Sequence, residues 1–141
     1  FFIQKRAFIS AEYEYVNYAL ASLYTYGNDR YSFAEENQDI KDKYGAQHVI
    51  RIGGELTVSD FFFVRLGYNY RTSPYRDRIN DGSAHTASAG IGFRSKGFFF
   101  DMTYQMKTTK ESYWLYSPLF VNAAENQYFY HRIIATLGFK F

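Results

Sequence analysis

The chain has 141 residues, contains no cysteine and carries a net charge of +2 from 16 basic and 14 acidic side chains. The lack of cysteine excludes disulfide frameworks, thiolate metal sites and cysteine nucleophiles. Charges of both signs alternate along the chain without a basic block, so nucleic acid is not an expected partner. Aromatic residues make up 22% of the chain at a mean hydropathy of −0.38, and no apolar run reaches the roughly 18 residues that a transmembrane helix needs.

The first elements of the chain alternate between apolar and polar residues, which predicts strands. Residues 1–4 are predicted to be the end of a strand that is cut off, and residues 5–24 to be a long strand. The alternation in the long strand breaks at Val16–Asn17, which indicates a bulge.

Five more strands with a period of two are predicted at residues 46–57, 61–73, 84–94, 98–109 and 126–141. One face of these strands is apolar and aromatic, whereas the other carries charged residues and glycine. A strand with two unlike faces lies between two unlike environments.

The connections between the strands alternate in length. Three of them, "QKRA", "TVSD" and "SKG", are tight turns, whereas the stretches 25–45, 74–84 and 110–125 are long. In the first long connection, Ser32 and Glu35 have the spacing of a capping box, so a helix is predicted that ends near Gly45. Alternating short and long connections are typical of a transmembrane β-barrel, whose short turns face the periplasm.

The sequence therefore predicts an all-β fold, an antiparallel transmembrane β-barrel in the bacterial outer membrane with its C-terminus at the periplasmic side. About six complete strands and one remnant are fewer than the roughly eight strands that a bacterial barrel needs. We therefore expect residues 1–141 to form the C-terminal strands of a larger barrel, with the earlier strands and the plug absent. A soluble β-sandwich, or a small barrel with a water-facing outer surface, is the alternative, and it would have to bury the continuous aromatic face.

Several segments resemble the C-terminal strands of the FadL-type outer-membrane transporters, in the style of members from the Bacteroidetes. They are "HVIRIGGELTVSDFFFVRLGYNYRTSPYRDRINDGS", "ASAGIGFRSKGFFFDMTYQM" and "ATLGFKF". The resemblance implies a barrel of about fourteen strands, within the size range of bacterial barrels. It also implies an N-terminal plug and passive uptake of hydrophobic compounds such as long-chain fatty acids.

The last strand ends on a stripe of apolar residues at every second position. The stripe consists of Ile133, Ala135, Leu137, Phe139 and Phe141. It resembles the C-terminal signal that the barrel assembly machinery reads on outer-membrane proteins, so this machinery is an expected partner.

The charged face supplies the candidate ligand-binding residues. They are Arg71, Lys107, Arg65, Arg94 and Arg132, of which Arg71 and Lys107 are predicted nearest the long loops. A cation there could bind the carboxylate of a fatty acid. The alternative is that acids and bases of neighbouring strands neutralise one another across the wall.

Glycine recurs on the charged face, where it weakens a strand unless another group uses the space. The glycines are Gly53, Gly67, Gly90, Gly92 and Gly138. Two uses are open: an aromatic or arginine side chain lies flat across the gap, or a plug approaches closely.

Tyrosines near the strand ends are expected to form an outer aromatic girdle, where ring and hydroxyl straddle the membrane interface. They are Tyr24, Tyr26, Tyr70, Tyr75, Tyr104, Tyr116, Tyr128 and Tyr130. Trp114 belongs to the last long loop and could contact lipopolysaccharide, a ligand or a partner protein.

The three histidines, His48, His85 and His131, are predicted near the loop-side ends of strands and lack a metal-binding spacing. No metal site, cofactor or catalytic grouping of serine, histidine and aspartate is predicted, so the chain is not expected to be an enzyme.

The predicted function is passive uptake of hydrophobic small molecules through an outer-membrane channel. Expected partners are outer-membrane lipid, lipopolysaccharide and the hydrophobic ligand. The alternative is a structural barrel subunit of an outer-membrane complex, which would contact other envelope proteins and have no transport role of its own.

Overall fold

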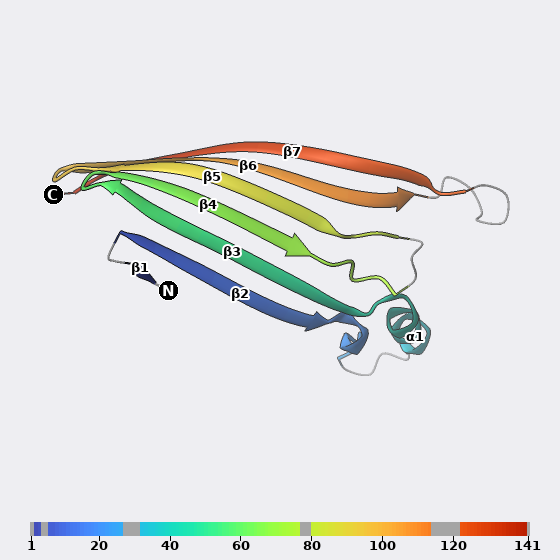
Figure 1. Ribbon diagram of the computed structural model, residues 1–141. Helices are drawn as coiled ribbons and strands as arrows, with labels where there is room; N and C mark the ends of the chain where they lie inside the picture. The colour runs from blue at the N-terminus through green and yellow to red at the C-terminus, as the bar shows by residue number, and fades with distance from the viewer. Residues whose placement is uncertain (1, 4–5, 27–31, 77–79, 114–121, 141) are drawn as a thin grey trace.

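The computed structural model describes residues 2–3, 6–26, 32–76, 80–113 and 122–140. These residues form one antiparallel sheet in which the strands follow one another in chain order (Figure 1). The strands are β1 (Phe2–Ile3), β2 (Ala7–Asn17), β3 (Ala46–Ser59), β4 (Phe62–Arg71), β5 (Ala84–Arg94), β6 (Phe98–Tyr113) and β7 (Ala124–Phe139). The predicted all-β antiparallel fold and the six long strands with one remnant are therefore confirmed.

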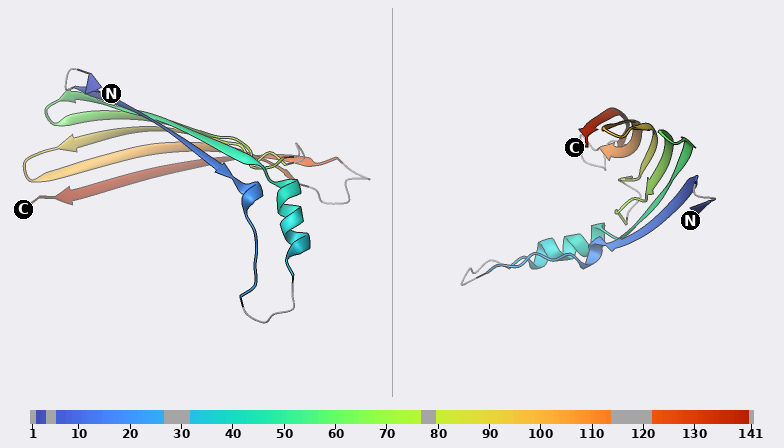
Figure 2. Two further views of the ribbon diagram at one scale, coloured as in Figure 1. Left: turned by 90° about the horizontal axis from the view of Figure 1, so that it is seen from below. Right: turned by 90° about the vertical axis from the view of Figure 1, so that its left-hand side faces the viewer.

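The sheet bends into an arc, and its two edges, β1 and β7, do not meet (Figure 2). The tight connections β3–β4 and β5–β6 lie at one end of the strands, here called the turn end, and β7 finishes beside them (Figure 1). The backbone N–H of Lys140 donates to the carbonyl of Gly97 in the β5–β6 turn at 2.9 Å. The long connections lie at the opposite end, the loop end, as the alternation of lengths predicts.

An almost unbroken register keeps like side chains in common rows across the sheet. One row consists of Ala11, Ile52, Tyr68, Ala87, Met106 and His131. The adjacent row consists of Ser10, Gly53, Gly67, Ser88, Gln105 and Arg132. Because side chains alternate between faces along each strand, the sheet has one apolar face and one polar face.

The apolar face is open, since no second sheet packs on it among the described residues. Leu66 is 65% exposed and Ile133 72% exposed, whereas the buried apolar residues in the described part of the chain are limited to Ala19, Val49 and Ala84. A soluble sandwich would bury this face in a core about 10 Å thick, and the second layer that it needs is not seen. No helix in the described ranges has the length and apolar character needed to cross a membrane.

The predicted strand at 5–24 is shorter in the structure, and the expected bulge at Val16–Asn17 is wrong. β2 ends at Asn17, whose side-chain Oδ1 accepts from the backbone N–H of Ala19 at 3.1 Å and caps a 3₁₀ helix, η1 (Tyr18–Leu20). An irregularity of register occurs instead between Thr57 and Ser59, next to the β3–β4 turn.

The predicted helix in the first long connection is present as α1 (Ala34–Lys43). Its N-cap is Phe33, which makes no side-chain capping bond, so the predicted capping box of Ser32 and Glu35 is wrong. The helix starts one residue later than that box requires, which removes Ser32 from the capping position. Acidic residues in the first turn and lysines in the last turn suit the helix dipole instead.

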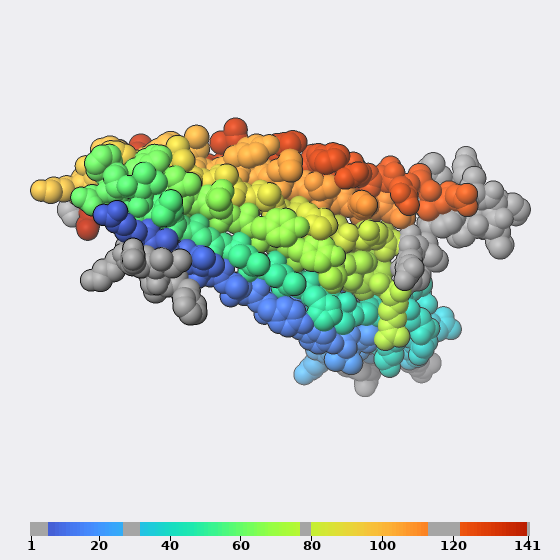
Figure 3. Space-filling view, in the orientation of Figure 1, coloured from blue at the N-terminus to red at the C-terminus, as the bar shows by residue number. Residues whose placement is uncertain are grey.

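The β2–β3 connection projects away from the sheet as an arm that consists of η1, α1 and the described residues around them (Figures 2 and 3). Asn37 of α1 fastens the two limbs of the arm. Its Oδ1 accepts from the backbone N–H of Leu23 at 2.7 Å, and its Nδ2 donates to the Leu23 carbonyl at 2.9 Å.

The last long connection is shorter than predicted, because β6 and β7 continue their pairing up to Tyr113 and Ala124. Trp114 and Tyr116 lie outside the described residues. The extension leaves β6 and β7 as the longest strands, 16 residues each.

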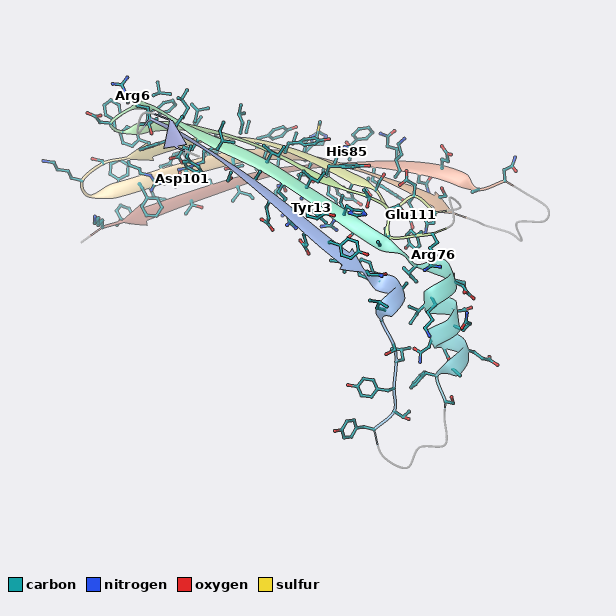
Figure 4. All side chains as sticks on the ribbon, turned by 60° about the horizontal axis from the view of Figure 1, so that its bottom comes forward. Arg6, Tyr13, Arg76, His85, Asp101 and Glu111 are labelled. Carbon is teal, nitrogen blue, oxygen red and sulfur yellow. The ribbon has the colours of Figure 1, made fainter. Side chains whose placement is uncertain are left out.

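Backbone contacts link neighbouring loops at the loop end. The N–H of Gly45 donates to the carbonyl of Pro74 at 2.8 Å, and the N–H of Arg76 to that of Lys43 at 2.9 Å. Arg76 accordingly lies beside α1 (Figure 4). On the other side, the backbone N–H of Ser112 donates to Oδ1 of Asn80 at 3.3 Å.

Candidate functional site

The polar face contains an ion-pair cluster centred on Arg65 of β4. The guanidinium contacts Glu55 of β3 through Nε and Asp101 of β6 through Nη1, each at 2.5 Å. Arg94 of β5 lies 3.7 Å from the second oxygen of Asp101. Glu55 and Asp101 have side chains only 19% and 20% exposed, so the cluster is partly screened from water. Four neighbouring strands are thereby joined on one face.

Glycine in β5 makes the bridge from Arg65 to Asp101 possible. β5 lies between their two strands, and Gly90 is opposite Arg65 while Gly92 is opposite Asp101. A Cβ at Gly92 would lie 2.6 Å from Oδ1 of Asp101 and 3.2 Å from Nη1 of Arg65. Of the two uses considered for these glycines, an arginine lying across the gap is the one that occurs at Gly92.

Phe99 lies in the same way across Gly138, its partner in the β6–β7 ladder. A Cβ at Gly138 would lie 2.2 Å from the Phe99 ring. The guanidinium of Arg94 lies over the rings of Phe63 and Phe99, at 5.5 and 5.6 Å from their centres. The polar face near the turn end is therefore filled by stacked aromatic and cationic groups.

Nearer the arm, Arg51 of β3 holds two carboxylates of β2. Its Nη1 lies 2.6 Å from Glu12 and its Nη2 lies 2.8 Å from Glu14. Arg51 is the opposite member of Glu12 in the ladder, as expected for charge pairing between adjacent strands.

The five predicted ligand-binding cations divide into two groups. Arg65 and Arg94 contact carboxylates, which fits the neutralisation alternative. No ion pair of Arg71, Lys107 or Arg132 occurs within the described ranges, and Lys107 instead lies 5.9 Å from the centre of the Tyr130 ring. Whether any of these cations binds a ligand stays a prediction.

Two of the three unpaired cations, Lys107 and Arg132, lie close together on the polar face. Lys107 is opposite Thr86 and Tyr130, and Arg132 is opposite Gln105, so Lys107 and Arg132 are diagonal neighbours on β6 and β7. Diagonal neighbours in a ladder are about 7–8 Å apart, within reach of one ligand carboxylate for long side chains. Arg71 lies two strands away, at the end of β4.

A hollow of about 550 Å³ lies on the polar face, and Thr86 and Gln105, the ladder partners of Lys107 and Arg132, are part of its lining. Small side chains from neighbouring strands form its floor, among them Ser10, Gly53, Gly67, Thr86 and Ser88. Asn69 also lines it, and Oδ1 of Asn69 is buried without a hydrogen-bond partner in the described structure. The charged residues of its lining are Glu12 and Arg51, which pair with each other, so the hollow combines open space, an unused acceptor and an internally neutralised ion pair.

The apolar face contains three tyrosine–histidine pairs of one design. The hydroxyl of Tyr13 lies 2.7 Å from Nδ1 of His48, that of Tyr68 2.7 Å from His85, and that of Tyr104 2.6 Å from His131. Each pair joins the two strands of a hairpin closed by a long loop. The spacing of the three histidines in the sequence does not indicate this pairing. A signal was available in the repeats "YEY", "YNY" and "YQM", each followed by a histidine on the next strand.

The predicted outer girdle needs one correction. Tyr70 and Tyr104 lie in rows of the apolar face, but Tyr128 and Tyr130 lie in the rows of Thr109 and Lys107 on the polar face. The latter two tyrosines therefore cannot belong to a girdle on the apolar face.

Tyr75 packs against Tyr44 where the arm meets the second long loop, with ring centres 5.2 Å apart. Burial raises the pKa of Tyr75 above its ordinary value of 10.0, and the neighbouring Tyr44 and Glu111 raise it further. In the same loop, Oδ1 of Asp81 accepts from the backbone N–H of Ser83 at 2.9 Å.

The predicted assembly stripe lies in rows of the apolar face. Leu137 is 58% and Phe139 64% exposed, and Ile133 and Ala135 share their side of β7. Phe141 lies outside the described residues. Reading of the stripe by an assembly machinery stays a prediction.

No group of three potential metal ligands occurs within the ranges that the structure describes. The sequence matches no protein-family model and no curated protein, and the fold matches no solved structure.

Proposed function

We propose that the chain forms the C-terminal strands of a larger outer-membrane β-barrel that takes up hydrophobic small molecules, such as long-chain fatty acids, without an energy source. The observation that carries this proposal is the pair of unlike faces that the register maintains over six strands. An antiparallel wall that is apolar on one side and charged on the other suits lipid outside and a lumen inside. The turn end would then face the periplasm and the loop end the cell exterior.

The hollow on the polar face supports a ligand site within the lumen. A fatty acid has an apolar tail and one carboxylate, so it needs open space and a small number of polar anchors. Arg71, Lys107 and Arg132 have no carboxylate partner in the described structure. Thr86 and Gln105, the ladder partners of Lys107 and Arg132, line the hollow. We infer that they bind the ligand carboxylate.

Uptake by the full-length protein in liposomes tests the transport proposal. A fluorescent long-chain fatty acid should enter protein-containing liposomes faster than liposomes with an unrelated closed barrel. Equal rates would contradict transport. Insertion is checked separately with a lipid-soluble labelling reagent, which should react with side chains of the apolar face if that face contacts lipid.

The arm favours a second candidate, a barrel subunit that binds another envelope protein. Leu20, Tyr24 and Tyr26 are 79%, 77% and 95% exposed on the arm, an unusual display for a surface that contacts water alone. Co-purification of a stoichiometric partner that is lost on deleting residues 20–26, together with an absence of uptake, would favour this candidate over transport.

A further inference from the structure

The three tyrosine–histidine pairs are staggered along the sheet in equal steps. Tyr13 is opposite Ile50, Ile50 is opposite Tyr70, and Tyr70 is opposite His85, so His85 lies in the row of Tyr13. The two other histidines can be placed relative to this row.

His48 lies in the row of Tyr15, two residues nearer the loop end than His85. His131 lies in the row of Ala87, two residues nearer the turn end than His85. The position therefore shifts by two residues from each hairpin to the next, always in the same direction.

This step has the size that a tilted barrel strand produces. Two residues rise about 7 Å and two strands span about 10 Å, which corresponds to a tilt of about 35°, within the range of about 35–45° for outer-membrane barrels. In a barrel with that tilt, the three pairs lie at one height above the membrane plane.

The strand starts show that the tilt has the required direction. Ala7, the first residue of β2, lies in the row of Val64, and β4 starts two residues before it at Phe62. Phe62 in turn lies in the row of Phe100, and β6 starts two residues before that at Phe98. The first residues of β2, β4 and β6 are therefore staggered in the same direction and by the same two-residue step as the tyrosine–histidine pairs.

The height of the pairs coincides with one interface of a bilayer. From His85, β5 continues to Arg94 at the turn end, about ten residues, and a strand crosses the hydrocarbon core in about 9–11. The pairs therefore mark the outer boundary of the apolar band, where lipid headgroups begin.

Each pair keeps one hydrogen-bond donor unused. If the tyrosine hydroxyl donates to Nδ1, the histidine Nε2–H is free, and if Nδ1–H donates to the hydroxyl oxygen, the tyrosine O–H is free. The pairs belong to separate hairpins about 10 Å apart, too far for a shared metal ion. His85 and His131 are exposed, as are their tyrosine partners.

We propose that Tyr13, Tyr68, Tyr104, His48, His85 and His131 form a belt that binds phosphate groups of lipid headgroups in the outer leaflet. The inference rests on the membrane location in the proposed function. Phosphate oxygens are strong acceptors. At the outer boundary of the apolar band they would lie beside the unused N–H or O–H donor of each pair, whose other neighbours are apolar. The regular repeat suits a layer of identical headgroups, one at each hairpin.

The test uses full-length protein in phosphatidylcholine nanodiscs that contain lipid A or lipid A with its phosphates removed. Native mass spectrometry then counts the lipid A molecules that stay bound. A hydrogen bond to a charged group contributes about 1.5 kcal/mol or more, so the phosphorylated form should be retained about tenfold better. Equal retention of the two forms would overturn the proposal.

Variants assign the effect to the belt. Replacing all three histidines (His48→Phe, His85→Phe, His131→Phe) should abolish the preference, and the milder set Tyr13→Phe, Tyr68→Phe, Tyr104→Phe should weaken it. Tyr15→Phe with Tyr70→Phe is the matched control, because it removes two hydroxyls beside the same histidines that make no bond to them. Loss of preference in the control alone, or in none of the variants, would contradict the belt.

Two further arms separate the sources of phosphate and the two proposals. Displacement of lipid A by millimolar inorganic phosphate would assign the donors to free phosphate and overturn a lipid site. Uptake of a fatty acid is measured on the same samples. Preference for phosphorylated lipid without uptake supports the belt and contradicts transport, whereas uptake without the preference contradicts the belt alone.

Discussion

Arg65 and Asp101 form an ion pair across an intervening strand, since Arg65 belongs to β4 and Asp101 to β6. Their side chains meet above Gly92 of β5. Asp101 lies toward the turn end of the sheet (Figure 4). The contact links β4 and β6 through side chains, in addition to the backbone ladders that join each of them to β5, and it sets strict limits on the residue beneath it.

Gly92→Ala should destabilise the full-length protein by about 1–3 kcal/mol, because the added methyl group occupies space that Asp101 and Arg65 already fill. The free energy of unfolding in urea is the measurement. Gly53→Ala is the control, since its Cβ would meet its nearest atoms at 3.6 Å, an ordinary contact. Equal stability of the two variants would show that the bridge does not depend on Gly92.

The ion pair itself should show energetic coupling. In a double-mutant cycle with Arg65→Met and Asp101→Asn, we expect a coupling of about 1–2 kcal/mol, since both groups are partly shielded from water. Arg71→Met combined with Asp101→Asn should show none, because Arg71 contacts no carboxylate in the described structure. A coupling near zero for the first cycle would leave the bridge without a role in stability.

Gly138→Ala should also be destabilising, by about 1–3 kcal/mol, because its methyl group overlaps the Phe99 ring. In a Phe99→Ala background the same substitution should cost less than about 0.5 kcal/mol, since the space above the strand is then vacant. Unfolding free energies of the four proteins provide the comparison. An additive result would contradict the contact between ring and backbone.

The unpaired cations should matter for charged ligands alone. Replacing Arg71, Lys107 and Arg132 by Gln should slow uptake of a long-chain fatty acid about tenfold, the effect of about 1.4 kcal/mol of lost carboxylate binding. Uptake of the corresponding uncharged alcohol should be unchanged. Lys96→Gln in the β5–β6 turn is the control for overall charge, and slowing of both probes would point to damage of the fold.

The contact between Tyr44 and Tyr75 should weaken at alkaline pH. The folded structure raises the pKa of Tyr75, so the stabilisation is complete below the ordinary value of 10.0 and is lost as the pH rises through the raised value. Hydrogen exchange of the N–H groups of Gly45 and Arg76 should accelerate above pH 10, beyond the increase from base catalysis. Tyr75→Phe should abolish this additional step, and its persistence would assign it to another group.

The two faces of the sheet could be predicted from the sequence because period-two alternation needs no knowledge of which strands pair. Hairpins then fix the pairing, so the rows of Ala11 and Ser10 extend over all six long strands. The strand end at Asn17 was missed because a local bond from its side chain to the backbone outweighs the remaining strand pattern.

The partners of individual cations could not be predicted. The carboxylate that Arg65 contacts two strands away is set by the register of both ladders around β5, which fixes Gly92 beneath the bridge. The sequence pattern places Arg65 and Arg71 on the same charged face, but it does not show that Arg65 contacts carboxylates and that Arg71 contacts none in the described structure. The tyrosine–histidine pairs also depend on register, because their members are diagonal neighbours rather than opposite ones.

The bonds between neighbouring loops have a mechanical consequence. The arm is fastened to the second long loop through Gly45 and Arg76, and that loop is fastened to β6 through Asn80 and Ser112. A force that pulls on the arm is therefore transmitted over the whole loop end as far as β6. The loop end should therefore respond to such a force as one linked segment rather than as three separate loops.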